Sequence, residues 1–288
     1  MSVQLILLSG ELAWGPQSVN LSTTVAELIQ KVAQHVGKPA IAIHLLHEST
    51  ILDTEAALRS LGVASKAGPI TLQCSIDAML METQSVFDKF LIVLGDLNAK
   101  RKTGATIYES KAVARSAIDA TLKEISAAAG LDSLPADAAA WLRVLLCSGK
   151  NFCDYVDDFV WTGDVDWGGV GEIEGGSTGG VAAGGLIYVS IFGDNDNVLC
   201  WIVDAGGELA KMNGEEGAGA VYFAETWDDI WECEGLLTRA FWQDVKNNGG
   251  THGQVTIVSP PKRVAGCLTD LFAAWMANGG VPGGRKGK

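Results

Sequence analysis

Closely spaced carboxylates are the residues of this sequence whose type and spacing best suit chemistry. Three pairs stand two positions apart in the second half of the chain: Asp164 with Asp166, Glu172 with Glu174, and Asp194 with Asp196. Residues two apart leave a strand on one face, so each pair suits a hard cation or a division of acid and base roles. Neither aspartate loop carries the closing Glu of a calcium-binding EF-hand. Solvated turn carboxylates are the interpretation that we favour.

Other catalytic chemistry finds little support. Nucleophilic catalysis needs a His beside a Ser or Cys, and none of the four histidines lies in a nucleophile motif. The Gly-rich stretch 163–185 lacks the glycine spacing, between a strand and a helix, that cradles phosphates. The six cysteines form no C-x-x-C pair and are interpreted as buried free thiols. We therefore expect no enzyme, no cofactor and no resident metal.

The negative charge is concentrated in one segment. Residues 151–250 carry 19 acidic and 3 basic residues, a balance of −16; residues 1–150 contribute −1 and residues 251–288 contribute +4, for a net −13. Such a segment repels phosphate backbones, so we expect no nucleic-acid partner. It is either a solvated surface that keeps the chain soluble or a docking face for a basic partner.

Nothing in the sequence directs the chain to or through a membrane. No apolar run approaches the roughly 20 residues that cross a bilayer. Residues 1–4 lack the basic start of a secretory signal, and no long apolar core follows. We expect a soluble cytoplasmic protein, with the nucleus as an alternative location.

The first 76 residues predict a small mixed sheet with one helix. Strands are expected at 3–8, 18–21, 41–46, 50–52 and 70–74. Apolar residues at helical spacing predict a helix over 25–36, which Thr24 and Glu27 begin as a capping box and Gly37 ends. Hairpin, helix, strand, short strand and strand is the order of a β-grasp fold.

This segment resembles the ubiquitin-like domains. The resemblance rests on Leu8-Ser9-Gly10, Thr24-Val25-Ala26-Glu27-Leu28, Leu45-Leu46, Leu52-Asp53, Leu58, Gly62-Val63 and Thr71-Leu72. In that family an apolar surface patch binds partner helices, and the resemblance places Leu8 and Leu46 in it. Ser75 stands where the family has an apolar third residue. A plain strand role for Leu8 and a core role for Leu46 remain the alternatives.

Conjugation of a ubiquitin-like domain requires a free Gly-Gly tail. Here Cys74-Ser75-Ile76-Asp77 runs on without one. The resemblance therefore implies an integral recognition module and not a transferable tag. Residues 77–109 are expected to form a connector, with a helix over 77–100 and a following loop.

Residues 110–278 predict a larger α+β domain with a central, mainly antiparallel sheet flanked by helices. Helices are expected over 113–125 and after Pro135. A hairpin of 186–192 and 198–203 is expected to continue through a strand at 208–212 and another at 220–224. A helix capped by Thr226, a strand at 251–258 that Pro260-Pro261 stops, and a helix over 264–276 complete the domain. Residues 279–288 are expected to be a disordered tail.

This second region resembles the SUKH domains of a fungal cell-wall-assembly regulator and bacterial toxin-immunity proteins. The matching residues are Ile118, Leu122, Ile125, Gly130, Leu134-Pro135-Ala136-Asp137, Trp141-Leu142, Phe192-Gly193-Asp194, Trp201-Ile202-Val203-Asp204, Gly207 and 224–230. Ala138, Ser148 and the acidic Gly-rich insert depart from the family's pattern. The resemblance implies a protein-binding module without catalytic residues.

Together these features predict a non-catalytic adaptor that binds other proteins, either basic surfaces or ubiquitin-pathway components. Binding is expected at Leu8 and Leu46 in the first domain. In the second domain it is expected at an acidic cleft of Asp164, Asp166, Trp167, Asp194 and Asp196. The alternatives are a metal-assisted hydrolase that uses the same carboxylates and a structural subunit of a larger complex.

Overall fold

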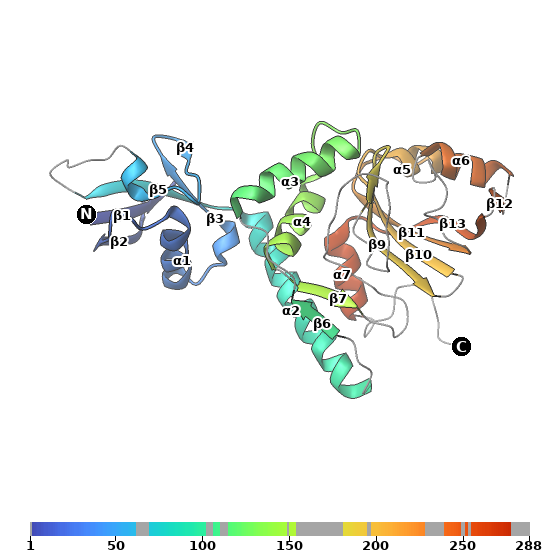
Figure 1. Ribbon diagram of the computed structural model, residues 1–288, viewed down its shortest axis with the longest axis horizontal. Helices are drawn as coiled ribbons and strands as arrows, with labels where there is room; N and C mark the ends of the chain where they lie inside the picture. The colour runs from blue at the N-terminus through green and yellow to red at the C-terminus, as the bar shows by residue number, and fades with distance from the viewer. Residues whose placement is uncertain are drawn as a thin grey trace. The chain divides into compact units, whose positions relative to one another are not determined.

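The structure, a computed structural model, divides the chain into two compact units (Figure 1). It describes residues 2–61, 69–101, 106–109, 115–148, 150–153, 181–194, 197–227, 239–248, 251–252 and 255–277. The first unit comprises Met1–Ser85 and Ala114–Ala117, and the second comprises Val86–Val113 and Ile118–Lys288. Both contain helices and sheets, which confirms the α+β class. The boundaries of the predicted domains stay predictions.

Five strands and one long helix build most of the first unit. They are β1 (Ser2–Leu7), β2 (Leu12–Ser18), α1 (Val25–Val36), β3 (Ile43–His47), β4 (Thr50–Ile51) and β5 (Ile70–Ile76), with short 3-10 turns η1 (Ala40–Ala42) and η2 (Leu58–Leu61). The sheet order is β2-β1-β5-β3-β4, and β1 and β5 are its one parallel pair. A hairpin, a helix and a central parallel pair make the β-grasp arrangement. The ubiquitin-like fold expected from the sequence is therefore confirmed for this unit.

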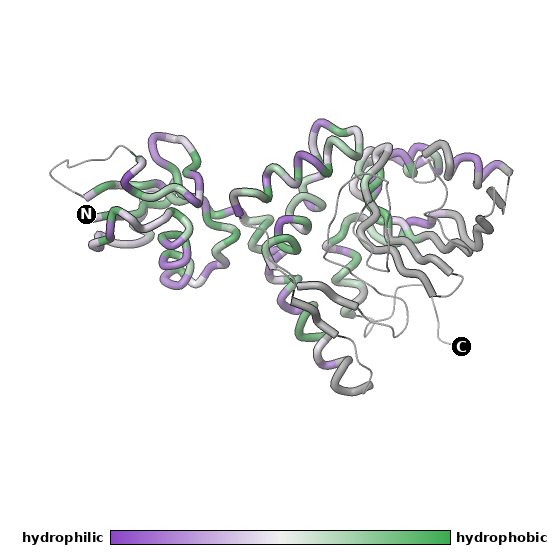
Figure 2. The backbone as a smooth tube through the Cα atoms, in the orientation of Figure 1, coloured by the Kyte–Doolittle hydropathy of each residue, from purple (hydrophilic) through white to green (hydrophobic). Residues whose placement is uncertain are grey.

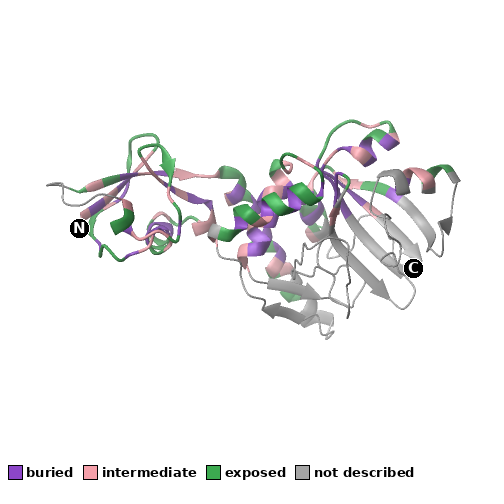
Figure 3. Cartoon of the chain, turned by 45° about the horizontal axis from the view of Figure 1, so that its top comes forward, coloured by how far each residue is buried: buried purple, intermediate pink, exposed green. Residues whose placement is uncertain are grey.

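Helix α1 begins where the sequence predicts it. The Glu27 amide donates to Thr24 Oγ1 at 3.2 Å and the Thr24 amide donates to Glu27 Oε2 at 3.0 Å, so both halves of the capping box are formed. Gly37 ends the helix in the left-handed conformation, with φ 63°. The apolar stripe of the helix is buried in a core with the sheet, as Figure 3 shows; its residues are Val25, Leu28, Ile29, Val32 and Ala33.

The second strand of the hairpin was wrongly predicted at 18–21. The chain turns back earlier, where the Leu7 amide donates to the Glu11 carbonyl at 2.8 Å, and β2 runs from Leu12 to Ser18. Gly15-Pro16 suggests a turn in the sequence, but β2 is an edge strand, where a proline is tolerated. Gly15 has φ +88°, and a Cβ there would lie 2.5 Å from the Val3 carbonyl oxygen, so this bend requires glycine.

Two helices contribute residues to both units. They are α2 (Ala78–Arg101), which lies where the sequence predicts a helix, and α3 (Arg115–Ala128). The hydropathy of both is drawn in Figure 2. Among the residues that the structure describes, no helix has the length and apolar character needed to cross a membrane.

The second unit is built on a six-stranded antiparallel sheet of order β12-β13-β11-β10-β9-β8. Its strands are β8 (Val181–Ala183), β9 (Leu186–Asp194), β10 (Asn197–Asp204), β11 (Ala220–Trp227), β12 (Thr251–His252) and β13 (Val255–Ala265). The remaining elements are α4 (Ala136–Ser148), α5 (Glu208–Asn213), α6 (Arg239–Asn248), α7 (Leu268–Ala277) and a separate pair, β6 (Thr106–Glu109) with β7 (Lys150–Cys153). Helices α5, α6 and α7 contact the large sheet, which confirms the expected antiparallel sheet flanked by helices.

Aromatic rings form the centre of the second unit's core. Trp141 of α4 is fully buried and stacks on Phe272 of α7, with ring centroids 4.1 Å apart. Phe87 meets Trp141 edge to face at 6.3 Å, and Phe90 meets Phe272 in the same way at 4.9 Å. Such pairs stabilise beyond the burial of their area.

Three predictions for this unit were wrong. Residues 208–212 form helix α5 and not a strand, because a buried carboxylate holds the start of that helix, as described below. Thr226 caps no helix: it lies in β11, opposite Val198 and Ile257. Pro260-Pro261 does not end its strand, since β13 runs on to Ala265. The short strand β12 pairs only with residues 255–256, so both prolines lie on an edge.

Candidate protein-binding surface

The sheet of the first unit has one face toward α1 and one face away from it. On β1, Val3 and Leu5 are fully buried in the core, whereas Ile6 is half-buried. On β3, Ile43 and Leu45 are buried and Leu46 is half-buried (Figure 3). Because side chains alternate along a strand, Ile6 and Leu46 point away from the core.

Strand register joins these two residues into a row across the whole sheet. Leu12 pairs with Ile6, Ile6 with Gln73, Gln73 with Leu46, and Leu46 with Ile51. These five residues, one from each strand, are called the outer row. At one strand spacing per step the row is about 19 Å long. Four of its five side chains are apolar.

The outer row is open at both of its ends. Leu12 is 58% exposed and Ile51 is 62% exposed, and Leu8, which directly follows β1, is 63% exposed. Single apolar side chains are common on protein surfaces. Contiguous ones mark binding sites more often than they serve the fold. The row therefore is the surface of the first unit best suited to a partner.

Polar contacts border the row, and one of them involves the charged guanidinium of Arg115. On one side Gln4 donates to Thr71 Oγ1 at 2.8 Å. On the other side Ser75 pairs with His44, whose Nδ1 lies 3.3 Å from Arg115 Nη2. Since a guanidinium only donates, Nδ1 is the acceptor in that contact. Arg115 also donates to the Ala40 and Ile43 carbonyls at 2.8 and 2.7 Å, which holds the start of β3.

The sequence identified part of this surface. The structure places Leu46 in the outer row and Leu8 beside β1, whereas Ser75 lies outside the row and Gln73 takes the central place. Sequence reasoning missed Ile6, Leu12 and Ile51. The alternation of side chains along the predicted strand 3–8 could have identified Ile6 as an outward residue. Leu12 could not be identified, because the second strand was predicted at 18–21.

The acidic cleft expected in the second domain stays a prediction. Asp164, Asp166, Trp167 and Asp196 lie outside the described residues. Asp194 ends β9 opposite Asn197, but its side chain is not described. Within the described part of the chain, no three His, Cys, Asp or Glu side chains come together in a way that would hold a metal.

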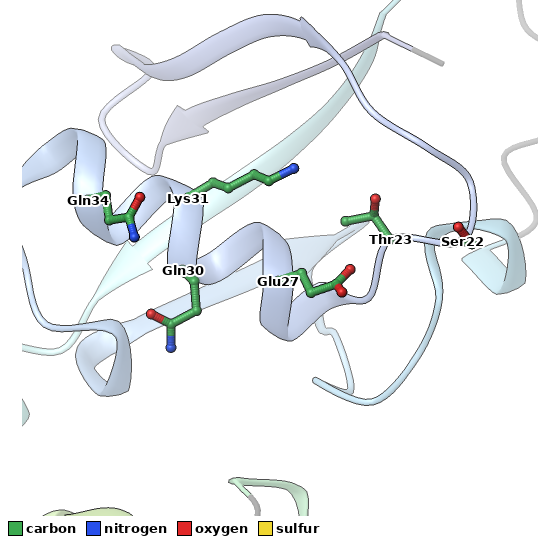
Figure 4. Close-up of a pocket in the computed structure, with 6 residues that line it drawn as sticks. All are labelled: Ser22, Thr23, Glu27, Gln30, Lys31 and Gln34. Carbon is green, nitrogen blue, oxygen red and sulfur yellow. The ribbon is translucent and has the colours of Figure 1, made fainter.

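An open groove runs along the exposed side of α1 (Figure 4). It encloses about 650 Å³ and is lined by Ser22, Thr23, Glu27, Gln30, Lys31 and Gln34. The Glu27 carboxylate is already engaged in the capping box. All six residues that line the groove are polar, so a substitution there serves as a control for substitutions in the outer row.

Asp204 ends the segment 201–204, which the sequence analysis matched to the SUKH pattern. It is fully buried at the end of β10. Its Oδ1 accepts from the Glu208 amide at 2.6 Å and its Oδ2 from the Ala210 amide at 2.8 Å. Burial raises the pKa of this carboxyl, and the amides of α5 oppose that rise. With its oxygens bound to backbone, Asp204 positions a helix and holds no ligand.

Asp137, from the Leu134–Asp137 pattern, has a similar structural role. Its carboxylate accepts from the amides of Leu268 and Thr269 and from the Thr269 hydroxyl at the start of α7. The same hydroxyl accepts from Trp141 Nε1 at 2.8 Å. The Asp-to-Trp pattern therefore joins α4 to α7.

Tyr222 is a further polar residue with a structural role, and it is fully buried. Its hydroxyl donates to Glu215 Oε2 at 3.1 Å, and Arg263 donates to the same oxygen at 3.2 Å. Burial, followed by the hydrogen bond to Glu215, raises the pKa of Tyr222 to about 12. The phenol is therefore protonated at neutral pH and acts as a donor.

Among known proteins, only solved structures match the chain, and those described here match it in part. No family model matches the chain, and no curated protein matches it. The chain is similar to the ubl5 domain from the polyubiquitin locus of T. thermophila, with 14% identity over 27% of this chain and 95% of that one and a TM-score of 0.24. A designed protein based on human erythrocytic ubiquitin matches with 25% identity over 26% of this chain and 90% of its own, with a TM-score of 0.23.

A third similar structure is that of ATBAG1 in complex with HSP70. It is 10% identical over 51% of this chain and 92% of that chain, with a TM-score of 0.23. TM-scores this low carry no argument about function. The ubiquitin-like fold of the first unit follows from its own strand order and register.

Proposed function

We propose that this chain is a non-catalytic adaptor that binds another protein through the outer row of its first unit, with Leu8 at the edge of that surface. The observation that carries the proposal is the register, which brings Leu12, Ile6, Leu46 and Ile51 into one line on the face away from α1. None of these four side chains belongs to the buried core of the unit or to the partly buried residues packed against it.

A protein suits this surface better than a small molecule does. A small-molecule site is concave and encloses most of its ligand. The outer row instead crosses a sheet from edge to edge. Its end residues, Leu12 and Ile51, are 58% and 62% exposed. The partner we propose is a protein, with ubiquitin-pathway components included.

The second half of the proposal is an acidic, SUKH-like binding module. Its support is the charge of −16 in residues 151–250 and the α+β arrangement of the second unit. Basic proteins are the partners that such a charge attracts, and nucleic acids are the partners that it repels. The binding residues proposed there remain Asp164, Asp166, Trp167, Asp194 and Asp196.

We also place the adaptor in the cytoplasm, with the nucleus as the alternative. Cys74 and Cys267 are free thiols in the structure. Free cysteines suit a reducing compartment, whereas disulfides are typical of secreted proteins.

The test compares proteins captured by the wild-type full chain and by two variants of it. Leu46→Arg with Ile51→Arg places charges in the outer row, and Gln34→Arg places the same charge in the groove along α1. We expect the wild-type chain and Gln34→Arg to capture the same proteins and the double variant to lose some of them. Identical capture by all three would refute the outer row as a binding surface.

A separate variant tests the acidic module, and a separate experiment tests the alternative function. Charge reversal at Asp164, Asp166, Asp194 and Asp196 is expected to remove a second, basic set of captured proteins. Calorimetry with Ca²⁺, Mg²⁺ and Mn²⁺ addresses the rival, a metal-assisted hydrolase. Cation binding that Asp164→Asn abolishes would favour that enzyme over the adaptor.

A further inference from the structure

We propose that a second copy of this chain binds along the exposed side of helix α2, and that the two α2 helices pack antiparallel around Ile92. This inference goes beyond the proposed function. It does not depend on the outer row, since α2 from Val86 onward belongs to the second unit. A dimer of this kind presents each binding surface of the adaptor twice.

The exposed side of α2 carries an apolar residue that the core does not use. Ile92 is 65% exposed, whereas Phe87 and Phe90, on the other side of the helix, are buried in the aromatic core. Leu91 and Val93 are half-buried. Four consecutive residues point in four directions around a helix, so α2 is apolar on all sides from Phe90 to Val93 (Figure 2). That pattern is typical of a helix that is covered on all sides.

One exposed apolar side chain is common on a protein surface, so the neighbours of Ile92 carry the argument. Lys89 lies one turn before Ile92 and Asp96 lies one turn after it, on the same side of the helix. Both are exposed, and neither forms an ion pair with a residue in the described ranges. The side of α2 around Ile92 therefore has a positive end and a negative end.

Gly95 lies on this side as well, and it is also exposed. A Cβ added to Gly95 would meet no atom within 4 Å, so no contact within the chain requires glycine at this position. Glycine weakens the interior of a helix. The absence of a side chain leaves room for one from a neighbouring helix.

These four residues complement a second copy of themselves. In an antiparallel pair, Lys89 of each helix meets Asp96 of the other, and two ion pairs form on either side of the centre. Ile92 lies near that centre, where the other helix offers the space above Gly95. Because both copies use the same surface, the contact closes as a two-fold dimer. A parallel pair instead brings like charges together at Lys89 and at Asp96, so charge selects the antiparallel arrangement.

The contact is short, and the dimer should therefore be weak. The seven steps from Lys89 to Asp96 span about 10 Å of helix. Contacts this small are typical of transient complexes, and we expect a dissociation constant on the order of 10–100 µM.

Sedimentation velocity of the full chain, at loading concentrations from about 5 to about 500 µM, measures the association. Ile92→Glu places a charge at the centre of the contact and should keep the chain monomeric at every concentration. Ala127→Glu places the same charge on the exposed side of α3 and should dimerise as the wild-type chain does. A wild-type chain that stays monomeric, or an Ile92→Glu variant that still dimerises, would overturn the inference.

Lys89→Asp and Asp96→Lys, each made alone, test the antiparallel pairing. Each variant carries like charges at both positions and should self-associate about tenfold more weakly than the wild-type chain at low salt. An equal mixture of the two should regain the wild-type affinity, because each aspartate then meets a lysine. A mixture that associates no more tightly than the single variants would overturn the pairing, whereas the capture experiment tests the adaptor function separately.

Discussion

The first unit leaves apolar side chains on the outside of its sheet, whereas the second unit takes the carboxylate of Asp204 into its interior. Leu12 and Ile51 are more than half exposed in a row that the core does not use. Asp204 is fully buried, and Asp137 binds the start of α7. Both arrangements are costly unless something compensates: exposed apolar surface favours association, and a buried charge needs hydrogen bonds.

The compensation differs between the two units. Asp204 and Asp137 find backbone amides within the second unit, so their unusual placement is explained by architecture. The outer row has no such explanation within the first unit. A buried carboxylate or an exposed apolar side chain therefore indicates function only where no contact within the fold explains its position.

Asp204→Ala is expected to produce the largest effect. It leaves the buried amides of Glu208 and Ala210 without their acceptor and should lower the free energy of unfolding by about 3 kcal/mol. Urea unfolding followed by tryptophan fluorescence measures this, since residues 1–85 contain Trp14 alone among nine tryptophans. Asp132→Ala, at an exposed acid of the same unit, is the control. A loss equal to that of the control would mean that Asp204 does not hold α5.

Asp137→Ala should have the next largest effect. It removes the acceptor of the Leu268 amide and of the Thr269 hydroxyl, and a lost helix cap costs about 1–2 kcal/mol. Faster hydrogen exchange at the start of α7, with α6 unchanged, is the specific readout. Uniform acceleration across the second unit would point to a general loss of packing.

The Tyr222 phenol should lose its proton at a higher pH than an ordinary tyrosine does. Its pKa is raised to about 12 in the folded chain, against about 10 unfolded. A raised pKa means that stability is intact below pH 10 and falls as the pH rises toward 12, because the unfolded phenol releases its proton first. Ultraviolet difference titration of the wild-type chain against Tyr222→Phe measures it. An ionisation near pH 10 that this variant removes would show that Glu215 does not hold the phenol.

Polar substitutions in the outer row should change stability least. Leu12→Thr and Ile51→Thr remove side chains that are mostly in water, so each should shift the free energy of unfolding by less than about 0.5 kcal/mol. Leu45→Thr, at the buried neighbour of Leu46, is the matched contrast and should cost several times more. A large loss of unfolding free energy in Ile51→Thr would show that the outer row stabilises the fold, and the contrast with the core residue Leu45 would be wrong.

The sequence allowed the β-grasp unit to be predicted because its signals are local. The capping box of Thr24 and Glu27 lies within one turn of helix, and the alternation in β3 and β5 requires no knowledge of the partner strand. The Leu186–Asp194 hairpin with β10 was found in the same way. Leu8 and Leu46 came from resemblance alone, and their binding role stays a prediction.

The failures depend on contacts between distant residues. Helix α5 has only six residues and begins because Asp204 accepts its amides. The prolines of β13 were interpreted as a break because edge position is a property of the whole sheet. The outer row needs the register of four strand pairs at once, and one misplaced strand was enough to hide Leu12.

Methyl NMR of the full chain tests the central claim most directly, when the chain is titrated with a protein that the wild-type chain captures and the Leu46→Arg, Ile51→Arg variant does not. The account predicts shifts confined to the methyl groups of Ile6, Leu8, Leu12, Leu46 and Ile51. The core methyl groups of Val25 and Leu28, and Ile118 of the second unit, should stay in place. Shifts among those three residues, with none in the outer row, would contradict it.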